Sequence, residues 1–174
     1  VSVLCFPFPF PFDFLNALSN LENRNNFSVS IAGGGSCVDK AKEIASTKGL
    51  GDVVHFNGWV HGLKLEELLS NSDILVLPSW AEGFPNAVIE AMAAGLAVIV
   101  TSVGNIPDIL THNSEALLVP PKDVDSLRSA IARLVDDEIL IRSLALKGHE
   151  FAKENFAIEE AVSKLEKLIY AVAH

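Results

Sequence analysis

Two hydrophobic patterns alternate along most of the chain. Short runs of β-branched and other apolar residues that end at Gly, Asn or charged residues predict strands. Segments in which apolar residues recur every three or four positions predict helices. The expected strands cover residues 27–32, 52–56, 74–77, 96–101 and 116–119. The expected helices cover residues 38–48, 63–71, 85–94, 124–135, 138–154 and 159–171.

This alternation predicts an α/β fold, a Rossmann-like doubly wound parallel sheet with helices on both faces. Strands that alternate with helices form parallel βαβ units with right-handed crossovers. Residues 74–77 and 96–101 are almost continuously apolar, as is typical of strands that are buried on both faces. We therefore expect these two strands near the centre of the sheet.

The first twelve residues do not follow this rhythm. VSVLCF has strand character, but it leads into Pro7, Pro9 and Pro11, which alternate with Phe residues. Because proline has no amide donor, we expect this segment to be extended, to form at most an edge of the sheet and to be dispensable for the fold. Helical character begins near Asp13, a candidate N-cap. We thus divide the chain into an atypical Phe- and Pro-rich segment, residues 1–12, and one domain, residues 13–174.

Composition narrows the class of protein. A chain of 174 residues with 49% hydrophobic residues and a mean hydropathy of +0.34 predicts a single globular domain. The formal net charge is −9, and no basic stripe occurs, so nucleic acid is not an expected partner. Cys5 and Cys37 lack metal or redox spacing, which favours reduced thiols and a cytoplasmic location. Because the chain starts at Val1 rather than Met, we expect a fragment of a longer protein.

The strongest candidate for chemistry is DILVLPSWAEGFPNAVIEAMAAGLAVIVT, residues 73–101. It predicts strand, loop, helix and strand, with Glu82 in the loop and Glu90 inside the helix. Amide groups at a helix N-terminus bind phosphate, and carboxylates accept hydrogen bonds from sugar hydroxyls. Asn86 and Glu90 share one helix face, whereas Val88, Ala91 and Met92 are expected to pack on the sheet. The combination suits a ligand with phosphates and hydroxyls, such as a nucleotide sugar.

Three predicted loops follow strands and belong at one edge of the sheet. Ligands of open parallel sheets bind beyond the carboxyl ends of the strands. The loops are residues 33–36, with Gly34 and Gly35, residues 58–62, with Gly58, Trp59 and Val60, and residues 79–85. Simpler readings remain open: GGGS as a plain turn, Trp59 and Trp80 as packing residues, and His61 as an exposed histidine.

PSWAEGFPNAVIEAMAAGLAVIVTSVGNIPDIL resembles the signature of the large family of retaining glycosyltransferases with the GT-B fold, family 4, also called glycosyltransferase group 1. FSVSIAGGGS, VVHFNGWV, LEELLSNSDILVLPS and EALLVPPKDVDSLRSAIARLVDD are similar to the flanking segments of that family. The resemblance runs from about Asp13 to the C-terminus. It implies the C-terminal, nucleotide-sugar-binding domain, with the N-terminal acceptor domain absent from the chain.

The resemblance also implies roles for the residues. Glu82 would be the catalytic-site acid that contacts donor-sugar hydroxyls, Glu90 would hold the ribose, and Gly58, Trp59 and Val60 would border the base. The sugar and diphosphate would be lined by Gly83, Phe84, Pro85, Asn86 and Ala87. The implied reaction moves a hexosyl group from an NDP-sugar, such as a UDP- or GDP-sugar, to a glycan or lipid-linked acceptor with retention. It needs no metal and no further cofactor, and peripheral membrane association through the absent domain is left open.

One departure from the family pattern concerns phosphate binding. Family members carry an Arg and a Lys after their first strand, whereas the first basic residue here is Arg24. We therefore expect the isolated chain to be inactive and to bind nucleotides weakly. Two alternatives remain: a non-catalytic binding or interaction domain on the same scaffold, and half of a sugar-nucleotide epimerase.

Overall fold

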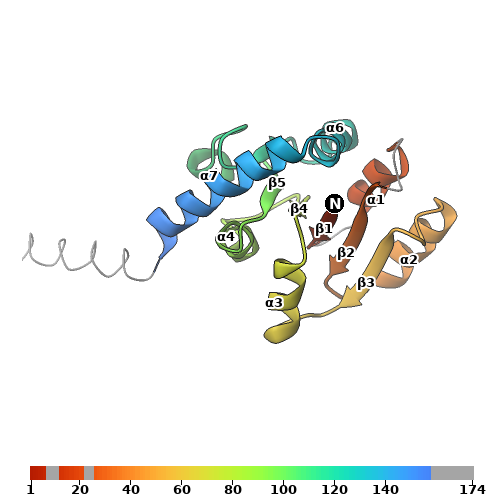
Figure 1. The fold of residues 1–174 in the computed structure, drawn as a ribbon. Helices are drawn as coiled ribbons and strands as arrows, with labels where there is room; N and C mark the ends of the chain where they lie inside the picture. The colour runs from red at the N-terminus through yellow and green to blue at the C-terminus, as the bar shows by residue number, and fades with distance from the viewer. Residues whose placement is uncertain (7–11, 22–25, 158–174) are drawn as a thin grey trace, which may run out of the picture.

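Six parallel strands form one sheet in the order β3-β2-β1-β4-β5-β6 (Figure 1). The computed structural model describes residues 1–6, 12–21 and 26–157. The strands are β1 (Ser2–Cys5), β2 (Ser28–Ala32), β3 (Val54–Gly58), β4 (Ile74–Leu77), β5 (Ala97–Thr101) and β6 (Leu117–Val119). The helices are α1 (Phe12–Ser19), α2 (Val38–Thr47), α3 (Leu63–Ser70), α4 (Asn86–Ala93), α5 (Ile106–Ile109), α6 (Val124–Val135) and α7 (Glu138–Phe156). The predicted doubly wound parallel sheet is confirmed.

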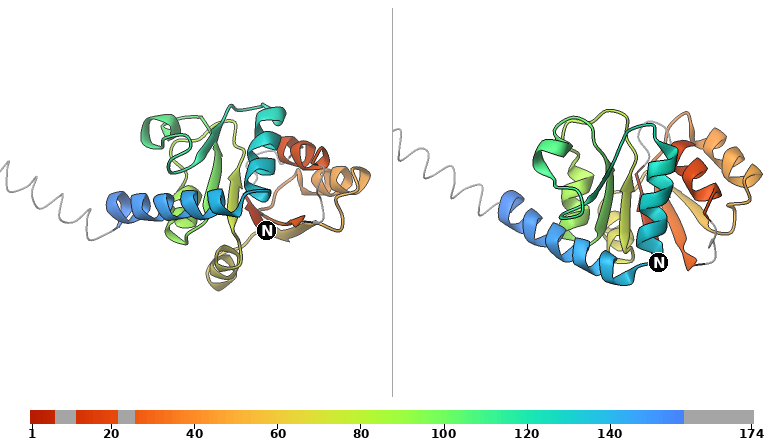
Figure 2. Two further views of the ribbon diagram at one scale, coloured as in Figure 1. Left: turned by 45° about the horizontal axis from the view of Figure 1, so that its top comes forward. Right: turned by 90° about the horizontal axis from the view of Figure 1, so that it is seen from above.

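Helices cover both faces of the sheet. α1, α2 and α6 lie on one face, and α3 and α4 lie on the other (Figures 1 and 2). α7 serves both faces, because Ile141 and Leu144 in its first half join one buried cluster, whereas Ala152 in its second half joins the other. The two faces are therefore tied together by one long C-terminal helix.

β1 lies at the centre of the sheet, between β2 and β4. Val3 stands opposite Val29 of β2 on one side and Ile74 of β4 on the other. The prediction that residues 1–12 form at most an edge is therefore wrong for Ser2–Cys5. The physical reason is that the prolines begin after the last residue of the strand, so they remove no donor from its two ladders. Pro7, Pro9 and Pro11 themselves lie outside the described residues.

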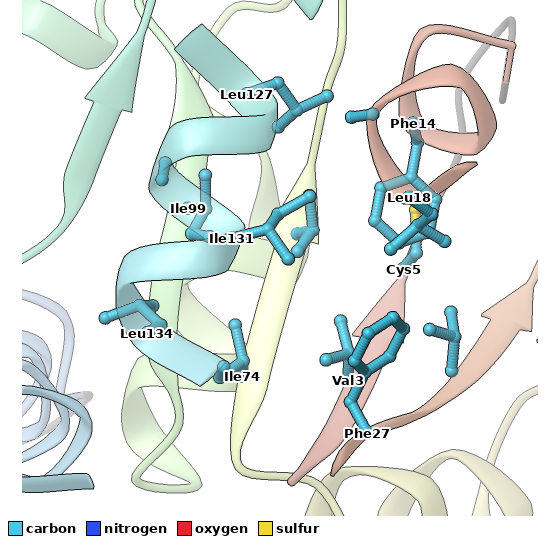
Figure 3. Close-up of a cluster of buried hydrophobic side chains, with 14 of the residues drawn as sticks. Val3, Cys5, Phe14, Leu18, Phe27, Ile74, Ile99, Leu127, Ile131 and Leu134 are labelled. Carbon is cyan, nitrogen blue, oxygen red and sulfur yellow. The ribbon is translucent and has the colours of Figure 1, made fainter. Parts of the chain in front are cut away.

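The core on the α1 and α6 face is built from alternate residues of the central strands. Figure 3 shows Cys5 of β1 beside Phe14 and Leu18 of α1, and it shows Val3 lower on the same strand, with Ile131 of α6 across the cluster. All five side chains are buried. Each fully buried aliphatic or aromatic side chain contributes about 1.5–3 kcal/mol relative to exposure. β1 is thus part of the main stabilising cluster.

Most predicted elements are confirmed to within two residues at each end. The residues at 74–77 and 124–135 match β4 and α6 exactly in extent. α5 was not predicted, because four residues are too few to show a helical period. The helix expected at 159–171 lies outside the described residues.

Candidate active site

The carboxyl ends of β1 and β4 are neighbours, and here the strand order reverses direction. In an open α/β sheet this switch point is the usual position of a ligand. The loops that follow β2, β3 and β4 reach this same edge because all the strands are parallel. The prediction that residues 33–36, 58–62 and 79–85 meet at one edge is confirmed.

The loops after β2 and β3 touch each other through glycines. The amide of Gly33 donates a hydrogen bond of 2.8 Å to the carbonyl of Gly58. A β-carbon on Gly34 would lie 2.4 Å from the indole Nε1 of Trp59, so a larger residue there would require the indole to move. Trp59 is nevertheless 74% exposed, and its prediction as a packing residue is wrong. The contact with Gly34 covers one part of the indole and leaves most of the ring available to a ligand.

Glu82 is held by the loop that follows β4. Its Oε1 accepts a hydrogen bond of 2.8 Å from the hydroxyl of Ser79, and its side chain is half-buried. Behind it, the amide of Asn105 donates to the carbonyl of Gly83 at 3.1 Å. Gly104, at φ +56°, lies so close that a β-carbon there would stand 1.9 Å from the carbonyl oxygen of Glu82. The turn after β5 therefore supports the Glu82–Gly83 peptide from behind.

α4 begins at the same edge with an uncapped N-terminus. Pro85 precedes its first residue, Asn86, and no side chain caps this end. The first amides of a helix have no intrahelical partner, and the helix dipole gives them a partial positive charge. With Ala87 next along the helix, this terminus offers amide donors for an anion.

Glu90 lies on the exposed side of α4. Asn86 and Glu90 are both exposed, whereas Val88, Ala91 and Met92 are buried. This division of helix faces follows the prediction from their spacing. The carboxylate of Glu90 makes no hydrogen bond or ion pair with any residue in the described part of the chain, so it is open to a ligand.

Three further contacts at the site were not predicted. The ring of Phe84 stacks on that of Phe156 at the end of α7, with centroids 5.5 Å apart. Trp80 donates from Nε1 to a carboxylate oxygen of Asp13 at 2.8 Å, and Lys122 Nζ lies 4.7 Å from the centroid of the Trp80 ring. These partners are distant in sequence, and no local pattern signals them. These contacts hold the loop that follows β4 against α7, α1 and the segment before α6.

The described residues offer little else with reactive chemistry. Burial raises the pKa of the Cys5 thiol well above its usual value, so this cysteine stays protonated and unreactive. Across residues 1–6, 12–21 and 26–157, no three His, Cys, Asp or Glu side chains gather in a way that suits a metal ion. Within the same ranges, every helix is too short or too polar to cross a bilayer. That the reaction needs no metal stays a prediction.

The family profile described as "Glycosyl transferases group 1" matches residues 11–154. The chain belongs to this family. One relative is an uncharacterised glycosyltransferase of Methanocaldococcus jannaschii, which is 34% identical over 71% of this chain and 32% of the relative. Another is the MMP alpha-(1->4)-mannosyltransferase of Mycolicibacterium hassiacum, 31% identical over 76% of this chain and 33% of the relative. The chain thus spans about a third of the length of these two glycosyl transferases.

Solved structures of similar proteins confirm the fold. Sucrose-phosphate synthase of Thermosynechococcus elongatus is 26% identical with a TM-score of 0.75, over 98% of this chain and 46% of that protein. A C-terminal domain of a glycosyl transferase group 1 family protein of Francisella tularensis is 23% identical with a TM-score of 0.77, over 90% of this chain and 85% of that domain. Anabaena HepE in complex with UDP is 18% identical with a TM-score of 0.85, over 98% of this chain and 48% of that protein. The chain has the fold of the C-terminal half of a GT-B glycosyltransferase.

Proposed function

We propose that this chain is the donor-binding half of a retaining glycosyltransferase that moves a hexosyl group from an NDP-sugar to a glycan or lipid-linked acceptor. The observation that carries the proposal is the pair of carboxylates, Glu82 and Glu90, on either side of the uncapped N-terminus of α4. Phosphates suit the helix amides, and hydroxyl-rich groups suit the two carboxylates. A nucleotide sugar has the hydroxyls of a ribose and of a sugar at opposite ends of its diphosphate.

Each part of the donor then has a partner. The diphosphate binds the backbone amides of Gly83, Phe84, Asn86 and Ala87, whereas Pro85, which has no amide N–H, lines the site with its ring. The ribose hydroxyls donate to Glu90, and the hydroxyls of the transferred sugar donate to Glu82. The base lies against the loop of Gly58, Trp59 and Val60, beside Gly34 and Gly35.

The chemistry that these residues perform is electrostatic. As the bond between the anomeric carbon and the diphosphate breaks, negative charge grows on the leaving phosphate oxygens. Amides that already point at these oxygens stabilise the charge without reorganisation. Glu82 holds the sugar so that the acceptor attacks the face from which the diphosphate leaves. No step requires a metal ion.

The remaining parts of the enzyme lie in this proposal outside the 174 residues. The two relatives are more than twice as long as this chain, and an N-terminal domain would bind the acceptor. Two free cysteines, Cys5 and Cys37, are consistent with a reducing cytoplasm. A non-catalytic binding domain on the same scaffold is the second candidate, favoured by the lack of any Lys or Arg before Arg24.

Titration calorimetry with UDP, GDP, UDP-glucose and GDP-mannose tests the proposal. Each missing charge-assisted hydrogen bond weakens binding by roughly 1.5–3 kcal/mol, so we expect dissociation constants on the order of millimolar. Glu90→Ala should weaken binding of every nucleotide further. Glu150→Ala is the matched control, because Glu150 is an exposed helical glutamate next to His149, whose ring meets the far end of α4 at the carbonyl of Ala93. Binding that is equally affected by both changes, or no binding at all, would contradict the proposal.

A further inference from the structure

Two polar side chains are buried in the described part of the chain, and both belong to the setting of Glu82. Ser79 is 0% exposed and Thr101 is 3% exposed. Ser79 follows β4, and Thr101 is the last residue of β5, the strand paired with β4. Both hydroxyls therefore lie at the edge of the sheet where the donor is proposed to bind.

Two hydrogen bonds that share Ser79 connect a central strand to the carboxylate. Thr101 Oγ1 donates a hydrogen bond to the backbone carbonyl of Ser79. The side-chain hydroxyl of Ser79 donates to Glu82 Oε1 at 2.8 Å. Thr101 of β5 thus fixes the backbone of the residue that holds the half-buried acid.

Burial makes this arrangement informative. A hydroxyl removed from water destabilises the fold unless it is hydrogen-bonded, and alanine or valine would fill the same space without that requirement. No buried side-chain nitrogen or oxygen among the described residues lacks a partner. Unlike apolar side chains of similar size, the two hydroxyls make hydrogen bonds that fix the loop carrying Glu82.

We propose that Ser79 and Thr101 are positioning residues for the donor sugar. Ser79 holds Glu82 Oε1, and Thr101 fixes the backbone of Ser79, so that Oε2 is presented to the sugar hydroxyls before the donor arrives. Gly104 completes the setting, since its missing side chain lets the Glu82 backbone rest against the turn after β5. This inference rests on the proposed function. It adds that sugar recognition, as distinct from nucleotide binding, is controlled from within the core.

The test compares affinity for a nucleotide sugar with affinity for its plain nucleotide, using UDP with UDP-glucose and GDP with GDP-mannose. Ser79→Ala should reduce the affinity gained from the sugar by about tenfold and leave the plain nucleotide unchanged. Ser79→Ala combined with Glu82→Ala should cost no more sugar affinity than Glu82→Ala alone, because Ser79 has no carboxylate to position once Glu82 is removed. Ser72→Ala is the matched control: Ser72 is half-buried, lies before β4, and donates to the carbonyl of Leu68.

A second measurement needs no ligand and covers the case in which Ser79→Ala is unstable. The carboxyl carbon resonance of Glu82, assigned by its absence in Glu82→Gln, should move in both Ser79→Ala and the near-isosteric Thr101→Val. An unmoved resonance in a folded variant, or a sugar gain that survives Ser79→Ala, overturns the inference and leaves the proposed function standing. Failure of the unaltered chain to bind any of the four ligands overturns the proposed function, and the inference with it.

Discussion

The two carboxylates proposed to bind the donor are set in place in different ways. Glu82 is half-buried, bonded to a buried serine, and supported from behind by Gly104 and Asn105. Glu90 is exposed on α4, and its carboxylate has no hydrogen-bonding partner among the described residues. One acid is positioned by contacts between distant segments, and the other is positioned by its helix alone.

This difference separates the two ends of the donor. The position of Glu82 depends on β5 and on the turn that follows it, so substitutions that never touch a ligand should alter sugar recognition. The position of Glu90 depends on the spacing of residues within one helix. Substitutions in the turn after β5 should therefore leave nucleotide binding intact.

The largest loss of stability is expected from a substitution in a strand that packs beside β4, because β4 leads to both Glu82 and Glu90. Leu4 is fully buried in β1, which pairs with β4, the strand that leads to both carboxylates. Leu4→Ala should destabilise the chain by about 2–5 kcal/mol, because it leaves a cavity in a close-packed core. Chemical denaturation measures this, with the exposed Leu63→Ala as the control. Equal stability of the two variants would contradict the central place of β1.

A smaller loss of stability is expected from Gly104→Ala, which should affect the function of Glu82 and leave that of Glu90 intact. The substitution combines a left-handed backbone, at φ +56°, with a collision against the carbonyl of Glu82. We expect a loss of about 1–3 kcal/mol of stability and loss of the affinity gained from the sugar. Gly95→Ala is the matched control, because Gly95 has φ +81° but open space around it. It should lower stability and leave sugar recognition unchanged. The same change in sugar recognition for both variants would show that strain alone is responsible.

Phe156→Ala tests the segment between the two acids. Phe84 lies between Glu82 and Glu90 in sequence and stacks on Phe156, which also meets Phe151 edge to face. Loss of the stack should lower stability by about 0.5–1.5 kcal/mol beyond the lost area and should weaken diphosphate binding, because the Phe84 backbone would move more freely. Ile139→Ala, on the exposed start of the same helix, is the control for calorimetry. Unchanged binding of UDP and GDP would show that the stack stabilises the fold alone.

The smallest effect concerns helix caps. Asp123 caps α6 by accepting from the amide and hydroxyl of Ser126, and these bonds lower the pKa of Asp123. A lowered pKa stabilises the fold above the unfolded-state pKa, and this contribution is lost as pH falls through the folded-state value. Asp123→Ala should therefore lower the melting temperature slightly at pH 7 and have little effect in strong acid. A pH-independent difference would contradict the assignment of the cap. Such a cap is missing at α4, where an anion is proposed instead.

The sequence predicted those features that repeat locally. The apolar run of β4 and the helical spacing of α4 placed Glu82 in a loop and Glu90 on an exposed face, as the structure has them. The position of β1 was missed because the prolines after Phe6 were taken to affect the strand before them. Hydrogen-bonding capacity is lost only at the proline itself, so Ser2–Cys5 keep their ladders.

Contacts between distant segments were beyond prediction. Ser79 and Thr101 are 22 residues apart, and Trp80 and Asp13 are 67 apart. No pattern within either segment indicates its partner. Packing was the simpler expectation for Trp59. The structure instead places its indole against Gly34 and leaves most of the ring exposed. The residues at the site were thus identifiable from the sequence, whereas their mutual support was not.

The most direct test of the account is a crystal structure of this chain soaked with UDP-glucose or GDP-mannose at high concentration. We predict the ribose hydroxyls within hydrogen-bonding distance of Glu90 and the diphosphate on the first amides of α4. The sugar hydroxyls should lie on Glu82 Oε2, with Oε1 still bonded to Ser79. A donor bound in the reverse direction, or at another edge of the sheet, would contradict the assignment of the two carboxylates.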